Sequence, residues 1–273
     1  MTAAHVAAVV RNDLRILARV RWVRAALLAG VVIAAIIAAN ASGEGGIDRL
    51  DTLRSGAASL LLLGGLAVAV CLGGGAFAHD AARGYLGLLV GSGATPSAVG
   101  VGRIAARLVT LLVILGAWTA ALVAGSAAIG EGGDGPLVVH ALSVFGNLSI
   151  VLCASAAMAS VIGPIAAGVF GLMVYVSAQA SVNLKAALES GAVSRDSHIV
   201  IDPFYALFPR ALVSPMIHEM QQRGVAGPSA PKVDVNGLEV VVPTSGWLSI
   251  VWTVFWAGIF LALAAYGVRR RQL

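Results

Sequence analysis

Charged residues are scarce in this chain. Only 11% of its 273 residues are Asp, Glu, Lys or Arg, whereas 59% are hydrophobic and the mean hydropathy is +0.91. A soluble domain carries roughly 25% charged residues, so the chain has too little charge to cover a water-facing surface. Intrinsic disorder is excluded because it requires low hydrophobicity and high net charge. The composition therefore indicates a polytopic membrane protein.

Cysteines are few, and nucleotide-binding motifs are missing. Cys71 and Cys153 lie in apolar runs without a CxxC partner, so we expect two buried thiols that pack as small hydrophobic groups. The dipeptide Gly-Lys does not occur, which excludes a P-loop, and no GxGxxG follows a strand. We expect no catalytic residues, no metal site and no cofactor in this chain, so any nucleotide-driven work belongs to another polypeptide.

Six stretches are long and apolar enough to cross about 30 Å of hydrocarbon as helices, which takes about 20 residues each. Gly163-Pro164 interrupts the longest uncharged run and predicts a tight turn, because proline cannot continue a helix without a kink. Gly163, Ala167 and Gly171 recur every four residues and would let helices approach closely. We predict one all-α permease domain over residues 1–273, whose spans are Trp22–Asn40, Gly56–Ala78, Leu108–Ile129, Leu137–Ser160, Ile162–Val182 and Trp247–Val268.

Basic residues are concentrated on one side of the predicted spans. Eleven lie beside the termini and in the loop between the second and third spans, against two, Arg49 and Arg54, in the short loops opposite. Short loops rich in Lys and Arg stay in the cytoplasm. We therefore expect a multi-pass protein of the cell (inner or plasma) membrane with both termini in the cytoplasm.

The N-terminal segment 5–24 is amphipathic. Arg11, Arg15 and Arg19 share one face at helical spacing, and Asp13 is the one residue that does not fit the opposite, apolar face. This pattern predicts an interfacial helix with its apolar face in the lipid and its arginines towards anionic headgroups. The apolar face comprises Val6, Val9, Val10, Leu14, Ile16, Leu17 and Val20.

The predicted external segment, residues 185–246, is too patterned for a linker. Asp202-Pro203 is a favourable helix start, and apolar residues then recur at helical spacing up to Met220, which predicts two or three short helices on the bilayer surface. Further on, alternating valines around Asn236-Gly237 predict a small β-hairpin.

The cytoplasmic loop 79–104 carries the most specific pattern. An acidic residue ends the second span, and a Leu-Leu pair, a Pro-Ser step and a Gly-basic step then lead into the third span. This pattern resembles the permeases of type-2 ABC exporters. The chain departs from the family pattern in two places: Asp80 replaces the commoner Glu, and Gly91-Ser92-Gly93 makes the middle of the pattern looser. The matching residues are Asp80, Gly84, Leu88, Leu89, Pro96, Ser97, Gly102 and Arg103.

The resemblance implies the membrane subunit of an ATP-driven exporter that lacks its own ATPase. Such a permease pairs with a second copy or a similar permease and recruits two cytosolic ATPases, which bind ATP and Mg²⁺; no nucleic acid is involved. The resemblance also implies a pathway between the two permeases, lined by the second and fifth spans. The residues expected to couple the permease to the ATPase are Asp80, Arg83, Gly84, Leu88, Leu89, Pro96 and Arg103.

Two other functional classes stay open from the sequence. An ion-coupled secondary transporter or channel is disfavoured because the spans carry no Asp, Glu, Lys or Arg at mid-depth, where such proteins place their ion relays. A non-transporting membrane scaffold is the third possibility. Dependence of transport on a co-expressed ATPase would separate an ABC permease from both of these classes.

The predicted topology can be tested by cysteine labelling. A cysteine introduced at Gly133 or Gly191 should react with a membrane-impermeant thiol reagent in intact cells, because both positions are expected outside. A cysteine at Ala94 should react only after the membrane is opened. Labelling of Ala94→Cys in intact cells would contradict the six-span arrangement.

Overall fold

A computed structural model describes residues 3–43, 48–77, 95–130, 134–223, 233–235 and 238–270 of the chain. Within these ranges six helices are long and apolar enough to cross a membrane, which confirms the predicted number of spans. The second span is continuous through a π-helical turn, η1. The spans are α2 (Arg21–Gly43), α3 (Asp48–Ser59) with η1 (Leu60–Gly64) and α4 (Gly65–Gly74), α7 (Pro96–Ala128), α8 (Gly135–Ala159), α9 (Pro164–Glu189) and α12 (Trp247–Arg270).

One predicted helix boundary agrees with the structure and another does not. The predicted turn at Gly163-Pro164 is confirmed, since α8 ends at Ala159 and α9 begins at Pro164, where the first turn tolerates proline. The start of α7 was misplaced: the helix begins at Pro96 rather than Leu108, because Arg103 and Arg107, which looked like loop charges, are buried inside it.

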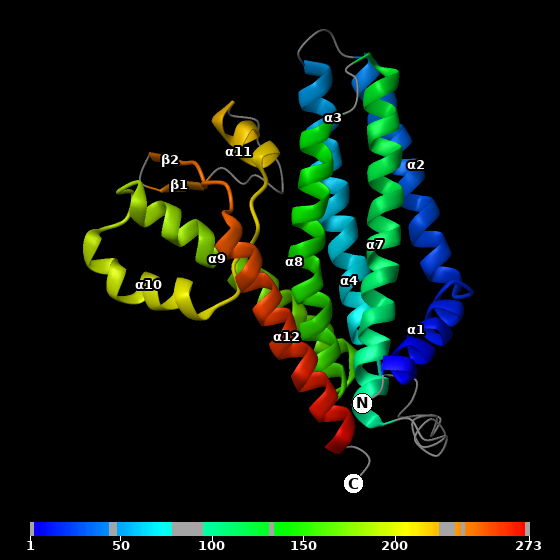
Figure 1. Ribbon diagram of the computed structural model, residues 1–273. Helices are drawn as coiled ribbons and strands as arrows, with labels where there is room; N and C mark the ends of the chain where they lie inside the picture. The colour runs from blue at the N-terminus through cyan, green and yellow to red at the C-terminus, as the bar shows by residue number, and fades with distance from the viewer. Residues whose placement is uncertain are drawn as a thin grey trace.

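The second span, α7 and α8 form the centre of the bundle (Figure 1). In the most apolar part of the second span and of α8, 56% of the residues are buried, against 17% in α2 and α12, which lie at the periphery. The N-terminal helix α1 (Ala3–Leu17), the start of α7 and the end of α12 lie at the same end of the molecule (Figure 1). Both termini therefore share one end, as an even number of spans requires.

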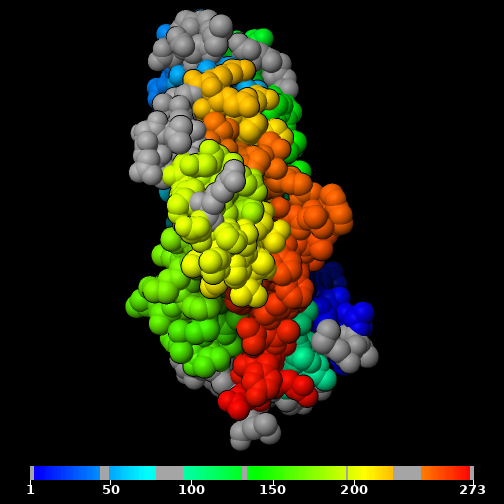
Figure 2. All heavy atoms as spheres, turned by 90° about the vertical axis from the view of Figure 1, so that its left-hand side faces the viewer, coloured from blue at the N-terminus to red at the C-terminus, as the bar shows by residue number. Residues whose placement is uncertain are grey.

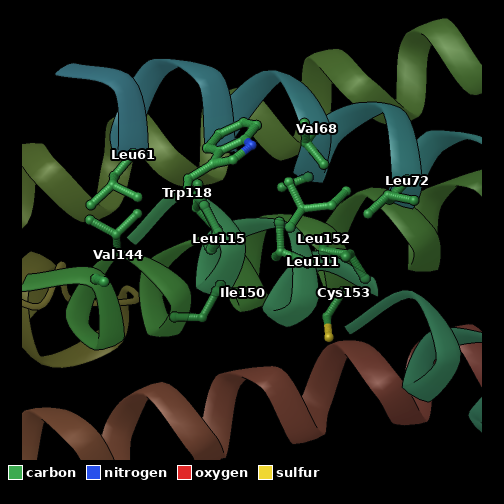
Figure 3. Packing of buried hydrophobic residues seen from close by; sticks show 14 of the residues in the cluster. Leu61, Val68, Leu72, Leu111, Leu115, Trp118, Val144, Ile150, Leu152 and Cys153 are labelled. Atoms are coloured by element: carbon green, nitrogen blue, oxygen red, sulfur yellow. The ribbon is translucent and has the colours of Figure 1, made fainter. Parts of the chain in front are cut away.

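The core is formed by aliphatic side chains of the second span, α7 and α8 around Trp118 (Figure 3). The Trp118 indole Nε1 donates a hydrogen bond to the carbonyl of Leu27 (3.1 Å). Gly64 leaves room for the ring, because a Cβ there would lie 3.0 Å from it. Cys153 is buried, as expected, whereas Cys71 is exposed on the outer face of α4, so the expectation of two buried thiols was wrong for Cys71.

The central helices touch through their smallest residues. Ser155 of α8 is fully buried between Gly73 of α4 and Gly171 of α9. A Cβ at Gly73 would lie 2.7 Å from the Leu152 carbonyl oxygen, and one at Gly171 would collide with the Ser155 side chain. Ala167 is buried on the same face of α9, but Gly163 has open space around it. The close approach of α8 and α9 therefore depends on Gly171 rather than on Gly163.

The segment between α9 and α12 contains two short helices. They are α10 (His198–Leu207), preceded by a 3₁₀ turn at Arg195–Ser197, and α11 (Pro215–Gln222). The predicted start at Asp202-Pro203 was wrong, because α10 already winds from His198 and contains Pro203, which forfeits one backbone hydrogen bond. Ser214 begins α11, and its side chain accepts a hydrogen bond from the Ile217 amide (3.4 Å).

The same segment is attached to α8 by buried polar groups, which we call the α8 latch: Asn147, His140 and their partners Leu212 and Ser214. The Asn147 side-chain oxygen accepts from the Leu212 amide (2.6 Å), and its nitrogen donates to the Leu212 carbonyl (3.0 Å). The His140 Nδ1 lies 3.0 Å from the Ser214 hydroxyl. Asn147 thus satisfies both backbone groups of Leu212, which fixes the path of the chain into α11.

Two short strands precede α12. Strand β1 (Val233–Val235) pairs antiparallel with β2 (Leu238–Val240), with Asp234 opposite Glu239. In Figure 1 these strands, α10 and α11 lie on one flank of the bundle.

The close contact of α8 and α9 can be tested by enlarging Gly171. Gly171→Val should lower the free energy of unfolding by about 1–3 kcal/mol, because the added side chain overpacks the contact with Ser155. Gly116→Val is the matched control, since a Cβ at exposed Gly116 of α7 meets nothing within 4 Å. Thermal unfolding in detergent measures both, and equal transition temperatures would contradict the assigned contact.

Candidate functional site

The end of the second span is held by an arginine from α7. The carbonyls in the last turn of a helix lack intrahelical partners, and here Arg107 supplies donors for them. Its Nη1 donates to the Leu72 carbonyl (2.8 Å), and its Nη2 donates to the carbonyls of Gly75 (3.2 Å) and Ala76 (3.3 Å). The planar guanidinium fork therefore caps α4 where the chain leaves the bundle.

Arg103, one turn before Arg107, extends the same contact towards α1. Its Nη1 donates to the Ala76 carbonyl (3.3 Å), and its Nε lies 3.9 Å from the carboxylate of Asp13. Arg103 and Asp13 are both buried, with 5% and 8% of their surfaces exposed. We call Asp13, Arg103, Arg107 and the carbonyls that the arginines bind the arginine cluster; it joins α1, α4 and α7.

Asp13 explains why α1 lies where it does. Burial raises the pKa of Asp13 above its usual value, although the positive charges of Arg103 and Arg107 act to lower the pKa. The carboxyl group is therefore poised between desolvation, which favours the neutral form, and two cations, which favour the charged form. A position on the outer face of α1 would give the carboxylate water but would separate it from both arginines.

Part of the face of α1 that was expected in the lipid is buried in the protein instead, and Ile16 of the same face stays exposed. Val9, Asp13 and Leu17, at four-residue spacing, are its buried residues and face α7. A Cβ at Gly102 of α7 would lie only 2.8 Å from the Val9 side chain, so the helices meet closely there. Ile16, assigned to the same apolar face, is 47% exposed, so only part of that face packs against the protein. The residue that did not fit the apolar face, Asp13, is the centre of the buried face.

The predicted site residues fall into three groups. Asp80, Arg83, Gly84, Leu88 and Leu89 lie outside the described residues. Pro96 is the first residue of α7 and follows Thr95 in extended conformation, whereas Arg103 points into the bundle rather than to its surface. The arginines expected at the membrane surface, Arg11, Arg15 and Arg19, are exposed on or directly after α1.

Sequence reasoning missed the internal roles of Asp13 and Arg107. A usable signal was present: Arg103 and Arg107 are one helical turn apart, and Asp13 is the single acidic residue in an arginine-rich helix. The α8 latch was also missed, because the partners of Asn147 and His140 lie more than sixty residues away in the chain.

A second buried ion pair closes the opposite end of the bundle. Arg54 forms a bidentate salt bridge with Asp134, in which Nε donates to Oδ2 (2.9 Å) and Nη2 donates to Oδ1 (3.0 Å). Asp134 also accepts from the Leu137 amide (3.4 Å) and so caps α8. A further contact of 3.6 Å joins Arg54 to Glu219 of α11. Helix α3 and the start of α8 are thereby tied to α11.

Comparisons of the chain with protein-family models, with curated proteins and with solved structures found no match.

The arginine cluster can be tested by removing the cap on α4. Arg107→Leu leaves the carbonyls of Leu72 and Gly75 without this donor and the Ala76 carbonyl with Arg103 alone, and an unsatisfied buried group costs about 1–3 kcal/mol. The amides of Gly75 and Ala76, which bond back to Cys71 and Gly73, should then exchange hydrogen about tenfold faster.

Arg11→Leu is the control for the Arg107 variant, since it removes the same charge from an exposed position on α1. Hydrogen exchange followed by mass spectrometry compares the two variants. Equal protection of residues 72–77 in both would show that Arg107 does not hold the end of α4.

Proposed function

We propose that this protein is the membrane-spanning permease subunit of a type-2 ABC exporter, driven by a separate cytosolic ATPase. The observation that carries the proposal is the residue pattern from Asp80 to Arg103, which runs from the connection between the second and third of six apolar helices into the first turns of the third. The chain has no P-loop, so ATP and Mg²⁺ would be bound by the partner.

The arginine cluster supports this proposal because it gives the loop a rigid base. The loop leaves α4 immediately after the carbonyls that Arg107 binds, and it returns to the bundle at Pro96. A displacement of the loop by an ATPase would therefore act on α4, α7 and α1 together. ATP-driven transport of this kind requires rigid-body movement of packed helices rather than local bending.

The charge distribution supports an orientation with this end in the cytoplasm. Both termini and the start of α7 lie there together with α1 (Figure 1), which carries Arg11 and Arg15 and is followed by Arg19. In the proposed arrangement α1 lies at the membrane surface, its buried face against α7 and its exposed arginines towards anionic headgroups. The segment 185–246 then lies outside, attached to α8 by the latch.

A second permease is part of the proposed assembly. The α9 helix exposes a large apolar surface in the monomer, with Ile165, Met173 and Val176 exposed by 85%, 62% and 62%. In the proposed dimer this surface faces lipid or the second permease, and the export pathway runs between the two copies beside the second span and α9. Two ATPases complete the complex.

The proposal predicts that charge in the Leu-Leu pair uncouples the complex. Leu88→Asp/Leu89→Asp should remove the apolar anchor for the ATPase, and the loss of such an anchor costs about 2 kcal/mol or more, roughly thirtyfold in affinity. We expect a permease of normal abundance that no longer copurifies with a Walker-motif protein and no longer supports ATP-dependent transport.

Ser92→Asp/Ala94→Asp provides the matched control, because it adds the same charge to the same loop at positions outside the family pattern. It should retain the partner. Wild-type copurification and transport in the Leu88/Leu89 variant would refute the coupling role and remove the main support for an ABC permease.

A further inference from the structure

A cavity of about 300 Å³ lies between α8, α9 and α12, away from the arginine cluster and the α8 latch. Its floor is formed by buried residues, Ala157 of α8 and Phe260 and Gly267 of α12. Phe170 of α9 closes one side through an edge-to-face contact with Phe260, with ring centroids 6.4 Å apart. In Figure 2 the lower half of α12, coloured orange to red, runs beside the green surface of α8 and α9.

The mouth of the cavity is apolar and faces outwards. Leu263 and Tyr266 of α12 and Val161 in the turn after α8 line it and are 51%, 55% and 65% exposed. In a helix that crosses a membrane, such a surface faces hydrocarbon, so an opening between these side chains is filled by acyl chains rather than by water. The volume is at the lower end of the range for small-molecule sites, about 300–1,000 Å³.

One end of the cavity carries a positive charge. Arg270, in the last turn of α12, lines it, and the guanidinium carbon lies 5.4 Å from the centre of the Tyr266 ring. Within the described part of the chain Arg270 makes no ion pair. From Phe260 to Arg270 the cavity follows α12 for roughly 15 Å, at 1.5 Å per residue. An apolar groove of this length that ends in a cation at the end of a span matches an amphiphile with an anionic head.

We propose that this cavity binds an anionic phospholipid, with one acyl chain against Phe260, Phe170 and Leu263 and the headgroup phosphate on Arg270. A helix of a second copy fits less well, because a helix with its side chains is roughly 10–12 Å across and would cover the cavity without filling it. The inference depends on the membrane-spanning character of α12 and not on the identity of the transported substrate.

The neighbouring arginine separates a specific site from a general attraction to anionic membranes. Arg269 is also exposed in the last turn of α12, where a cation favours the helix dipole, but it does not line the cavity. If the charge of the helix end alone attracted lipid, both arginines would contribute alike. A site in the cavity requires Arg270 specifically.

The test is native mass spectrometry of the full chain in mild detergent, titrated with phosphatidylglycerol and phosphatidylcholine of identical acyl chains. The wild type should retain one phosphatidylglycerol about tenfold more strongly than phosphatidylcholine, because the choline ammonium of phosphatidylcholine offsets the phosphate charge that Arg270 attracts. Arg270→Gln should abolish this preference, whereas Arg269→Gln should keep it. Ala157→Leu, which narrows the floor, should weaken the retention of both lipids.

Three results would overturn the proposal. Equal retention of the two lipids by the wild type would show that the cavity does not select an anionic head. Equal losses in Arg269→Gln and Arg270→Gln would assign the effect to general charge. Unchanged lipid retention in Ala157→Leu, with an unfolding temperature like that of the wild type, would place the lipid outside the cavity.

Discussion

The carbonyl groups at the end of α4 impose the constraint on which the inner end of the molecule depends. In an apolar bundle these groups find no water, and a buried carbonyl without a donor is costly. Arg107 satisfies three of them, but only by burying a charged guanidinium beside Arg103. Two buried cations in turn favour a nearby anion, and Asp13 draws α1 onto α7. A requirement of backbone chemistry thus explains why three segments that are far apart in the sequence meet.

The spans could be predicted because their signal is local: length and apolarity alone identify a membrane helix. The start of α7 could not, because the sequence does not show whether an arginine faces water or a row of carbonyls. The same limit applied to Asp13, whose fit depends on residues ninety positions away. For the loop 79–104 the pattern of residues is all that supports the coupling role, and the sequence did not show that Arg103, counted with that pattern, contacts Ala76 and Asp13 inside the bundle.

Packing of the central helices shows a related limit. The chain contains 33 glycines, and the sequence predicts that some of them allow close helix contacts. Which glycines do so is decided by the opposite helix: Gly73 and Gly171 face Ser155, Gly64 faces Trp118, and Gly116 faces nothing. Four-residue spacing identified Ala167 and Gly171 but also included Gly163, which lies in the turn. Periodicity therefore selects a face of a helix, whereas tertiary structure selects the residue.

The α8 latch has a consequence for the order in which the protein is assembled. Asn147 and His140 are synthesised before Leu212 and Ser214, so the receiving surface on α8 exists when the segment after α9 emerges from the ribosome. The partners on the other side come last: Ser245 accepts from the Val213 amide, and Trp252 of α12 donates to the Phe208 carbonyl. The stretch from Phe208 to Ser214 thus has partners on α8, which is synthesised before it, and on residues synthesised after it, so its hydrogen bonds can be completed only once α12 has been made.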